Sequence, residues 1–156
     1  MRRLSTGAIG AVLVGLALTV ALTADPAASS PRAEPDRPAR VNVIKVSGLL
    51  DPLLVDFVSR SIDQAEAEGV VALTLQLNSG GAVVPDAEVA ALTRQMGEAA
   101  VPIAVWVGPS GAKALNEAAD LVAAADDSGM APGTRITAPD GETLDDEEAV
   151  AAGVVD

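Results

Sequence analysis

Short apolar runs alternate with longer amphipathic segments along the chain from residue 41 onward. The apolar runs cover residues 41–46, 70–77 and 101–107, and they are rich in Val, Leu and Ile. The segments between them repeat apolar residues at helical spacing. This alternation with short connections predicts an α/β domain with a parallel sheet, right-handed crossovers and helices on both faces.

The first two helices have recognisable boundaries. Asp51 is suited to an N-cap, Pro52 to the first helical position, and Gly69 to the end of that helix. A second helix is predicted over residues 86–99. The residues expected to face the core share helical spacing; they are Leu54, Phe57, Val58, Ile62 and Ala65 in the first helix, and Val89, Leu92 and Met96 in the second.

The sequence of the C-terminal part predicts shorter helices and strands. Residues 128–134 have the pattern of a strand and a turn, residues 135–137 of another strand, and Pro139-Asp-Gly of a turn. Asp145 and Glu148 have the spacing of a capping box, which predicts a last helix over residues 146–152, closed by Gly153.

The N-terminal part has the composition of a leader. Two arginines precede an apolar run from about Ala8 to Leu22, so residues 1–24 are expected to be a signal sequence or an N-terminal anchor. Residues 25–40 are rich in Pro and Ala and predict a disordered linker. One domain, residues 41–156, remains, and we expect it to be exported and extracytoplasmic, either secreted or anchored by the leader.

The composition excludes several classes of function. A net charge of −12 argues against a nucleic-acid partner. The chain has no His and no Cys, which removes Ser-His-Asp and Cys-His catalysis and the common zinc ligands. The acidic pair Asp126-Asp127 and the run at 145–148 lack the spacing of a calcium loop, so no metal site is expected. No cofactor is expected either.

Two turns at predicted strand ends are candidate sites. The turn Asn78-Ser-Gly-Gly-Ala82 could direct backbone N–H groups at an oxyanion or a ligand carbonyl, or could be an ordinary turn that needs glycine. The second turn begins at Gly108 and is expected to open a helix. Ser110 and Lys113 would then be neighbours three residues apart and could form a Ser/Lys pair; an ordinary surface lysine is the alternative.

Three segments together resemble the NfeD family, whose membrane-bound ClpP-class serine protease domain has the ClpP/crotonase fold. They are Leu77–Val84, Val105–Ala114 followed by Met130–Thr134, and Glu147–Asp156. The family patterns read roughly L-D-T-P-G-G-L-V, then Y-V-G-P-S-G-A-R-A-A-S-A-G and M-A-P-G-T, then A-E-E-A-L-E-L-G-V-I-D. The resemblance implies a ClpP/crotonase-like spiral with a mostly parallel sheet and a shortened C-terminal part.

The resemblance also implies which catalytic groups are absent. Family members use a Ser/Lys dyad, and Asn116 occupies the position of the nucleophilic serine. The glycine pair of the oxyanion loop falls on Gly81 and Ala82 without a gap, or on Gly80 and Gly81 with one. The family's lysine comes from a long helical segment that is replaced here by a short bridge, and no lysine follows Lys113.

We therefore expect an inactive domain that binds or scaffolds a membrane protein or peptide and has the capacity for weak homo-oligomerisation. One alternative is residual serine endopeptidase activity with Ser110 or Ser79 as the nucleophile. Another is a STAS-like regulatory domain, because a strand, helix and apolar strand over residues 41–77 fit that pattern too.

Overall fold

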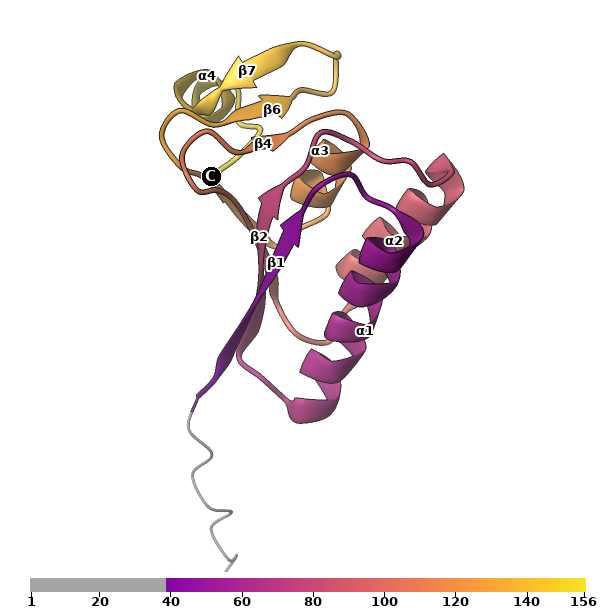
Figure 1. Cartoon of the computed structure of the whole chain (residues 1–156). Coiled ribbons are helices and arrows are strands. Elements are labelled where there is room, and N and C mark those ends of the chain that lie inside the picture. Colours follow the sequence, from indigo (N-terminus) through magenta and orange to yellow (C-terminus); the bar gives the residue numbers. More distant parts are fainter. Residues whose placement is uncertain (1–38) are drawn as a thin grey trace, which may run out of the picture. The chain divides into compact units, whose positions relative to one another are not determined.

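The computed structural model describes residues 39–156 (Figure 1). The predicted leader and nearly all of the predicted linker lie outside these residues. In chain order the elements are β1 (Val41–Ser47), α1 (Pro52–Glu68), β2 (Ala72–Asn78), α2 (Asp86–Glu98), β3 (Ile103–Val107), β4 (Lys113–Ala114), α3 (Glu117–Ala123), β5 (Asp127–Met130), β6 (Arg135–Thr137), β7 (Thr143–Asp145) and α4 (Asp146–Ala151).

The strands form two sheets. The larger sheet has the order β1-β2-β3-β5 and all its neighbours are parallel. The smaller sheet has the order β4-β6-β7, in which β4 and β6 are parallel and β7 is antiparallel to β6. The predicted parallel sheet is confirmed, because each crossover through a helix returns the chain in the same direction.

The core lies between the larger sheet and its helices. Leu73, Leu75 and Leu77 alternate along β2 and are fully buried. Helix α2 presents Val89 and its predicted partners to this core, and the predicted span of α2 is correct to within one residue. The largest fully buried side chains share this layer; they include Leu50, Ile62, Met96, Ile103, Leu121 and Ile136.

Only one face of the larger sheet is covered by helices. Figure 1 shows α1 and α2 on the same side of β1 and β2. Side chains of the other face are exposed or half-buried, and we call it the open face; it comprises Val41, Val43, Lys45, Ala72, Thr74, Gln76, Ala104 and Trp106. The prediction that helices cover both faces is therefore wrong for the part of the chain that the structure describes.

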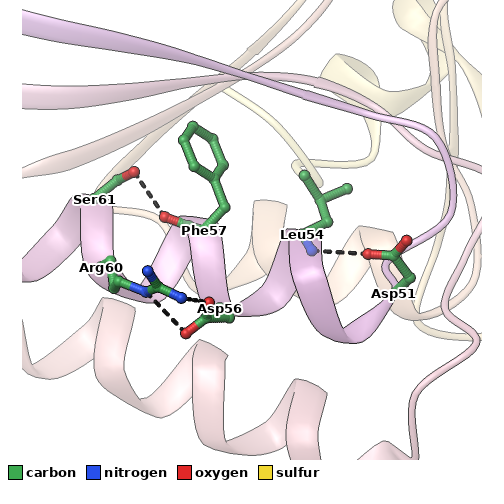
Figure 2. A network of polar contacts seen from close by, with 6 residues as sticks. All are labelled: Asp51, Leu54, Asp56, Phe57, Arg60 and Ser61. Atoms are coloured by element: carbon green, nitrogen blue, oxygen red, sulfur yellow. Dashed lines mark hydrogen bonds and ion pairs between the residues drawn. The ribbon is translucent and has the colours of Figure 1, made fainter.

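Helix α1 begins and ends where the sequence predicts. The Asp51 carboxylate accepts a hydrogen bond from the Leu54 N–H at 2.8 Å, as Figure 2 shows, and this bond satisfies a backbone donor of the first turn. Gly69 ends the helix in the left-handed conformation at φ 61°. Phe57 differs from the prediction, since it is 44% exposed. Its ring lies beside β1, at the sheet edge, where no other described element covers it.

The C-terminal elements are close to the predicted ones. The capping box of Asp145 and Glu148 is confirmed, with both of its hydrogen bonds present. The strand predicted within residues 128–134 is β5, and the one predicted over 135–137 is β6. Strand β7 was not predicted, because Thr143–Asp145 is too short to show a period. Within residues 39–156, no helix has both the length and the apolar character needed to cross a membrane.

Candidate functional site

The glycine loop Asn78–Ala82 lies at the carboxyl end of β2 and is held on both sides by backbone hydrogen bonds. On one side, Leu50 donates its N–H to the Gly81 carbonyl and Val83 donates to the Leu50 carbonyl, each at 2.9 Å. On the other side, the Ser79 N–H donates to the Lys113 carbonyl at 2.7 Å. The loop is therefore fixed between the start of α1 and β4, at the edge of the sheet where parallel α/β folds place their sites.

Gly81 is required by this arrangement. Its φ is +128°, a conformation that residues with a side chain rarely adopt. A Cβ at this position would lie 2.9 Å from Oε2 of Glu117 and 3.3 Å from Nδ2 of Asn116. The glycine thus lets two side chains from the next turn approach the loop backbone.

Asn116 lies in a strained turn between β4 and α3. Its φ and ψ are 51° and −128°, and it is the one residue other than glycine with positive φ in the described chain. Its N–H donates to Oγ1 of Thr137 at 3.0 Å, and its side-chain amide donates to the Gly80 carbonyl at 3.2 Å. A non-glycine residue in such a region costs about 1–3 kcal/mol, and strain of this kind concentrates at functional turns.

Glu117 was not singled out in the sequence, yet it makes the central contact of the site. Its Oε2 accepts a hydrogen bond from the Ala82 N–H at 3.0 Å. Ala82 belongs to the loop predicted to bind an oxyanion. The Ala82 N–H could otherwise stabilise the negative charge of an oxyanion, but it is already bound to the Glu117 carboxylate. The sequence signal that could have identified Glu117 is its position directly after Asn116, the candidate nucleophile position.

The serines and the lysine considered as substitutes make no hydrogen bond to one another in the described residues. Ser110 and Lys113 are not helical neighbours, because α3 begins only at Glu117 and Lys113 lies in β4. The Ser110 hydroxyl donates to the Pro132 carbonyl at 2.6 Å. Ser79 is buried, and its hydroxyl donates to the Gly81 carbonyl at 3.0 Å. The predicted Ser110/Lys113 proximity on a helix is therefore wrong.

Lys113 lies instead along the glycine loop. Its Nζ is 3.5 Å from the position that a Cβ would take on Gly80. Its backbone N–H donates to the Asn78 side chain at 3.2 Å. The ammonium group is thus placed on the loop backbone and makes no hydrogen bond to either serine in the described residues.

Four of the six acidic residues considered as metal ligands bind backbone groups. Asp126 accepts from the Ile103 N–H at 2.8 Å, and Asp146 accepts from the Gly133 N–H at 2.8 Å. Asp145 and Glu148 are used in the capping box. Between residues 39 and 156 no group of three or more potential ligand side chains is arranged to hold a metal ion.

The site carries an excess of negative charge. Partial burial raises the pKa of the Asp120 carboxyl above its ordinary value, and the carboxylates of Glu117 and Asp86 raise it further. Glu117 and Asp120 are three residues apart on α3, a spacing that places them side by side. The Glu117 carboxylate opposes the formation of an oxyanion at the Ala82 N–H, whereas the Lys113 ammonium lies at Gly80 of the same loop.

Asp120→Asn is expected to stabilise the protein at neutral pH by about 0.5 kcal/mol, the size of a like-charge helical pair. The raised pKa means that the folded state keeps its proton to higher pH than the unfolded state does. Stability therefore falls as the pH rises through the window above about 4, the unfolded value. Urea unfolding between pH 4 and 7 measures this, and the gain should vanish at the acid end. Asp127 is exposed, as Asp120 is, and Asp127→Asn is the control; an equal gain there would contradict the assignment.

The comparisons with known proteins concern structure. No protein-family model matches the chain, and no curated protein sequence matches it. Among solved structures, one similar protein is the 1510-N membrane protease specific for a stomatin homolog, from Pyrococcus horikoshii. The TM-score is 0.68 at 21% identity, over 74% of this chain and 71% of that one.

Two further solved structures are similar to this chain. A variant of the 1510-N membrane-bound stomatin-specific protease in complex with a substrate peptide gives a TM-score of 0.58 at 21% identity, over 74% of this chain but only 55% of that one. An enoyl-CoA hydratase/isomerase family protein from Silicibacter pomeroyi gives 0.63 at 14% identity, over 74% and 70% of the two chains.

These likenesses establish the fold. The described part of the chain has the ClpP/crotonase fold, as the sequence motifs predicted. The parallel order of the larger sheet agrees with it. The STAS-like alternative therefore has no support from the structure.

Proposed function

We propose that the chain is an exported, catalytically inactive NfeD-type domain that binds a membrane protein or peptide. The proposal rests on the sequence motifs that resemble the NfeD family, on the ClpP/crotonase fold and on the state of the candidate site. A scaffold of this kind keeps the shape of a protease site while its chemistry is lost.

The observation that carries the proposal is that the site is closed by its own side chains. Asn116, at the position where the family has its serine, uses its amide to bind the Gly80 carbonyl. Glu117 binds the Ala82 N–H. An amide has no ionisable proton for a base to remove, and a bound carboxylate blocks the donor that an oxyanion would need.

The missing base supports the same conclusion. The only lysines within residues 39–156 are Lys45 and Lys113, and neither follows Asn116 in the chain. Lys113 contacts the glycine loop and makes no hydrogen bond to Ser110 or Ser79 in the described residues. A serine without a base in reach is a weak nucleophile.

The location and partner are proposed from two further observations. Residues 1–24 have a charged start and an apolar run, which supports export and membrane association. The similar 1510-N protein is a membrane protease specific for a stomatin homolog. We therefore propose that the partner is itself a membrane protein, or a peptide derived from one.

Labelling with a fluorophosphonate serine probe tests the inactive state. We expect the full chain to remain unlabelled under conditions that label an active Ser/Lys peptidase. Ser110→Ala and Ser79→Ala serve as matched variants. Strong labelling that disappears in one of them would overturn the proposal and assign residual endopeptidase activity to that serine.

A further inference from the structure

Strand β1 is an edge of the larger sheet, and its outer side is unpaired in the described chain. The sheet order places β1 next to β2 alone. The Arg40 carbonyl accepts from Val71 and the Gly48 N–H donates to Asn78, so the backbone groups of even-numbered residues point toward β2. Successive residues of a strand direct these groups to opposite sides. The N–H and C=O groups of Val41, Val43 and Lys45 therefore point outward.

The side chains along this edge are apolar and uncharged for the most part. Val41 and Val43 are 54% and 65% exposed and lie on the open face. On the helix face, a groove runs between β1 residues 41–44 and the α1 side chains of Phe57, Ser61 and Gln64. Unpaired edges of this kind are templates for another strand.

The strand at this edge lacks the carboxylates that would make copies of an acidic protein repel each other. The whole chain has a net charge of −12, yet residues 39–50 contain no Asp or Glu and carry Arg40 and Lys45. Two copies can approach along β1 with no carboxylate of either strand facing one of the other. Like charges directly opposite each other on paired strands would be destabilising.

We propose that two copies of the chain pair through β1, antiparallel, about a two-fold axis at Val43. In this register Val43 lies opposite Val43 of the second copy, and Val41 lies opposite Lys45. All three are residues whose backbone groups point outward, so each facing pair exchanges two hydrogen bonds, about six in all. The result is one continuous sheet with the helices of both copies on the same face.

The side chains fit this register on both faces. On the open face, the two Val43 side chains contact each other, and each Val41 packs on the aliphatic part of a Lys45 side chain. On the helix face, the grooves of the two copies meet, which covers the half-exposed Phe57. Figure 2 shows the Phe57 ring on the opposite side of α1 from the Asp56–Arg60 ion pair, so the contact leaves that pair undisturbed.

The self-complementary register is the reason for proposing a second copy as the occupant. An isologous contact repeats each favourable pair twice, once in each direction. An unrelated peptide strand would need its own apolar residues at alternate positions, and nothing in the chain specifies them. The proposal does not depend on the state of the catalytic site, since Val41, Val43 and Lys45 make no hydrogen bond to the glycine loop or to Asn116 in the described residues.

Cysteine cross-linking of the full chain tests the register, because the protein has no native cysteine. In the proposed dimer the two Val43 Cα atoms are about 5.5 Å apart, within disulfide range. We expect Val43→Cys to give a disulfide-linked dimer as the main product on a non-reducing gel after mild oxidation. The controls are Lys45→Cys and Ser47→Cys, whose copies would be about 13 and 26 Å apart at 3.3 Å per residue.

A double variant checks the direction of the strands. Val41→Cys and Lys45→Cys should each remain mostly monomeric and should cross-link when combined, because only an antiparallel register places 41 opposite 45. Equal cross-linking at 43, 45 and 47 would overturn the register. Absence of a linked dimer at 43, with light scattering showing a monomer at every concentration tested, would overturn the dimer. Cross-linking of Val43→Cys to a different protein only would assign the edge to that partner and would also overturn it.

Discussion

Asn116→Ser is expected to leave the full chain folded and still unable to react with a fluorophosphonate probe or to cleave a peptide. The new hydroxyl would lie in the turn where the family places its nucleophile, but the family's lysine has no counterpart after Asn116, and Lys113 precedes it on the glycine loop. Loss of a dyad partner alone lowers the rate by roughly 10⁴- to 10⁶-fold. Labelling kinetics measure the result, and thermal unfolding confirms that the variant is folded.

The second variant in this series removes the competing carboxylate. Asn116→Ser combined with Glu117→Gln frees the site of one negative charge, and we expect it to stay inactive for want of a base. Activity in the double variant alone would show that Glu117 was the sole block and that a base is present. Activity in Asn116→Ser itself would contradict both parts of the argument. Ser110→Ala in each background controls for labelling at another serine.

Leu75→Ala is expected to cost about 2–5 kcal/mol of unfolding free energy, the range for a fully buried leucine. Leu75 lies in β2, between β1 and β3, and has no exposed surface. A domain of this size has about 5–15 kcal/mol of stability in total, so the loss is a large share of it. Urea unfolding followed by circular dichroism measures the change.

The same substitution at an exposed site is the control. Leu53 is 75% exposed at the start of α1, and Leu53→Ala should change the stability by no more than about 0.5 kcal/mol. A loss at Leu75 no greater than that at Leu53 would show that β2 is not the centre of the core.

Local signals made the helix boundaries predictable. Asp51, Pro52 and Gly69 each satisfy a backbone requirement that depends on a few neighbouring residues, and the capping box of Asp145 and Glu148 does the same. The parallel sheet followed from the order of apolar runs. These features need no knowledge of distant contacts, which explains why the sequence predicts them.

The sequence predictions were wrong where tertiary contacts determine the burial or the secondary structure of a residue. Phe57 has the spacing of a core residue but meets no covering element, because β1 is an edge strand. Lys113 follows a turn like the start of a helix but pairs as β4 with Arg135, since the second sheet offers it a partner. Thr74 and Gln76 on β2 were the visible sign that one face of the sheet is less buried than the other.

The sequence motifs indicate where the candidate site lies, but its chemistry depends on contacts between distant residues. The turn at Gly108 was predicted from its glycines and proline, and Asn116 from the family motif aligned to the chain without a gap. The contact of Glu117 with Ala82 joins residues 35 positions apart, and no local pattern encodes it. The proposal of an inactive domain, which the sequence supports by a missing serine and a missing lysine, therefore also uses a contact that only the fold creates.

The open face of the sheet has a consequence for observing this protein in solution. Trp106 lies on that face, is 40% exposed, and is the only tryptophan in a chain with no tyrosine. Its ring lies against Gly108, where even a Cβ would come within 2.6 Å of it. Intrinsic fluorescence therefore reports from a single, fixed position, and any partner that covers this face is expected to shift the emission to shorter wavelength without an added label.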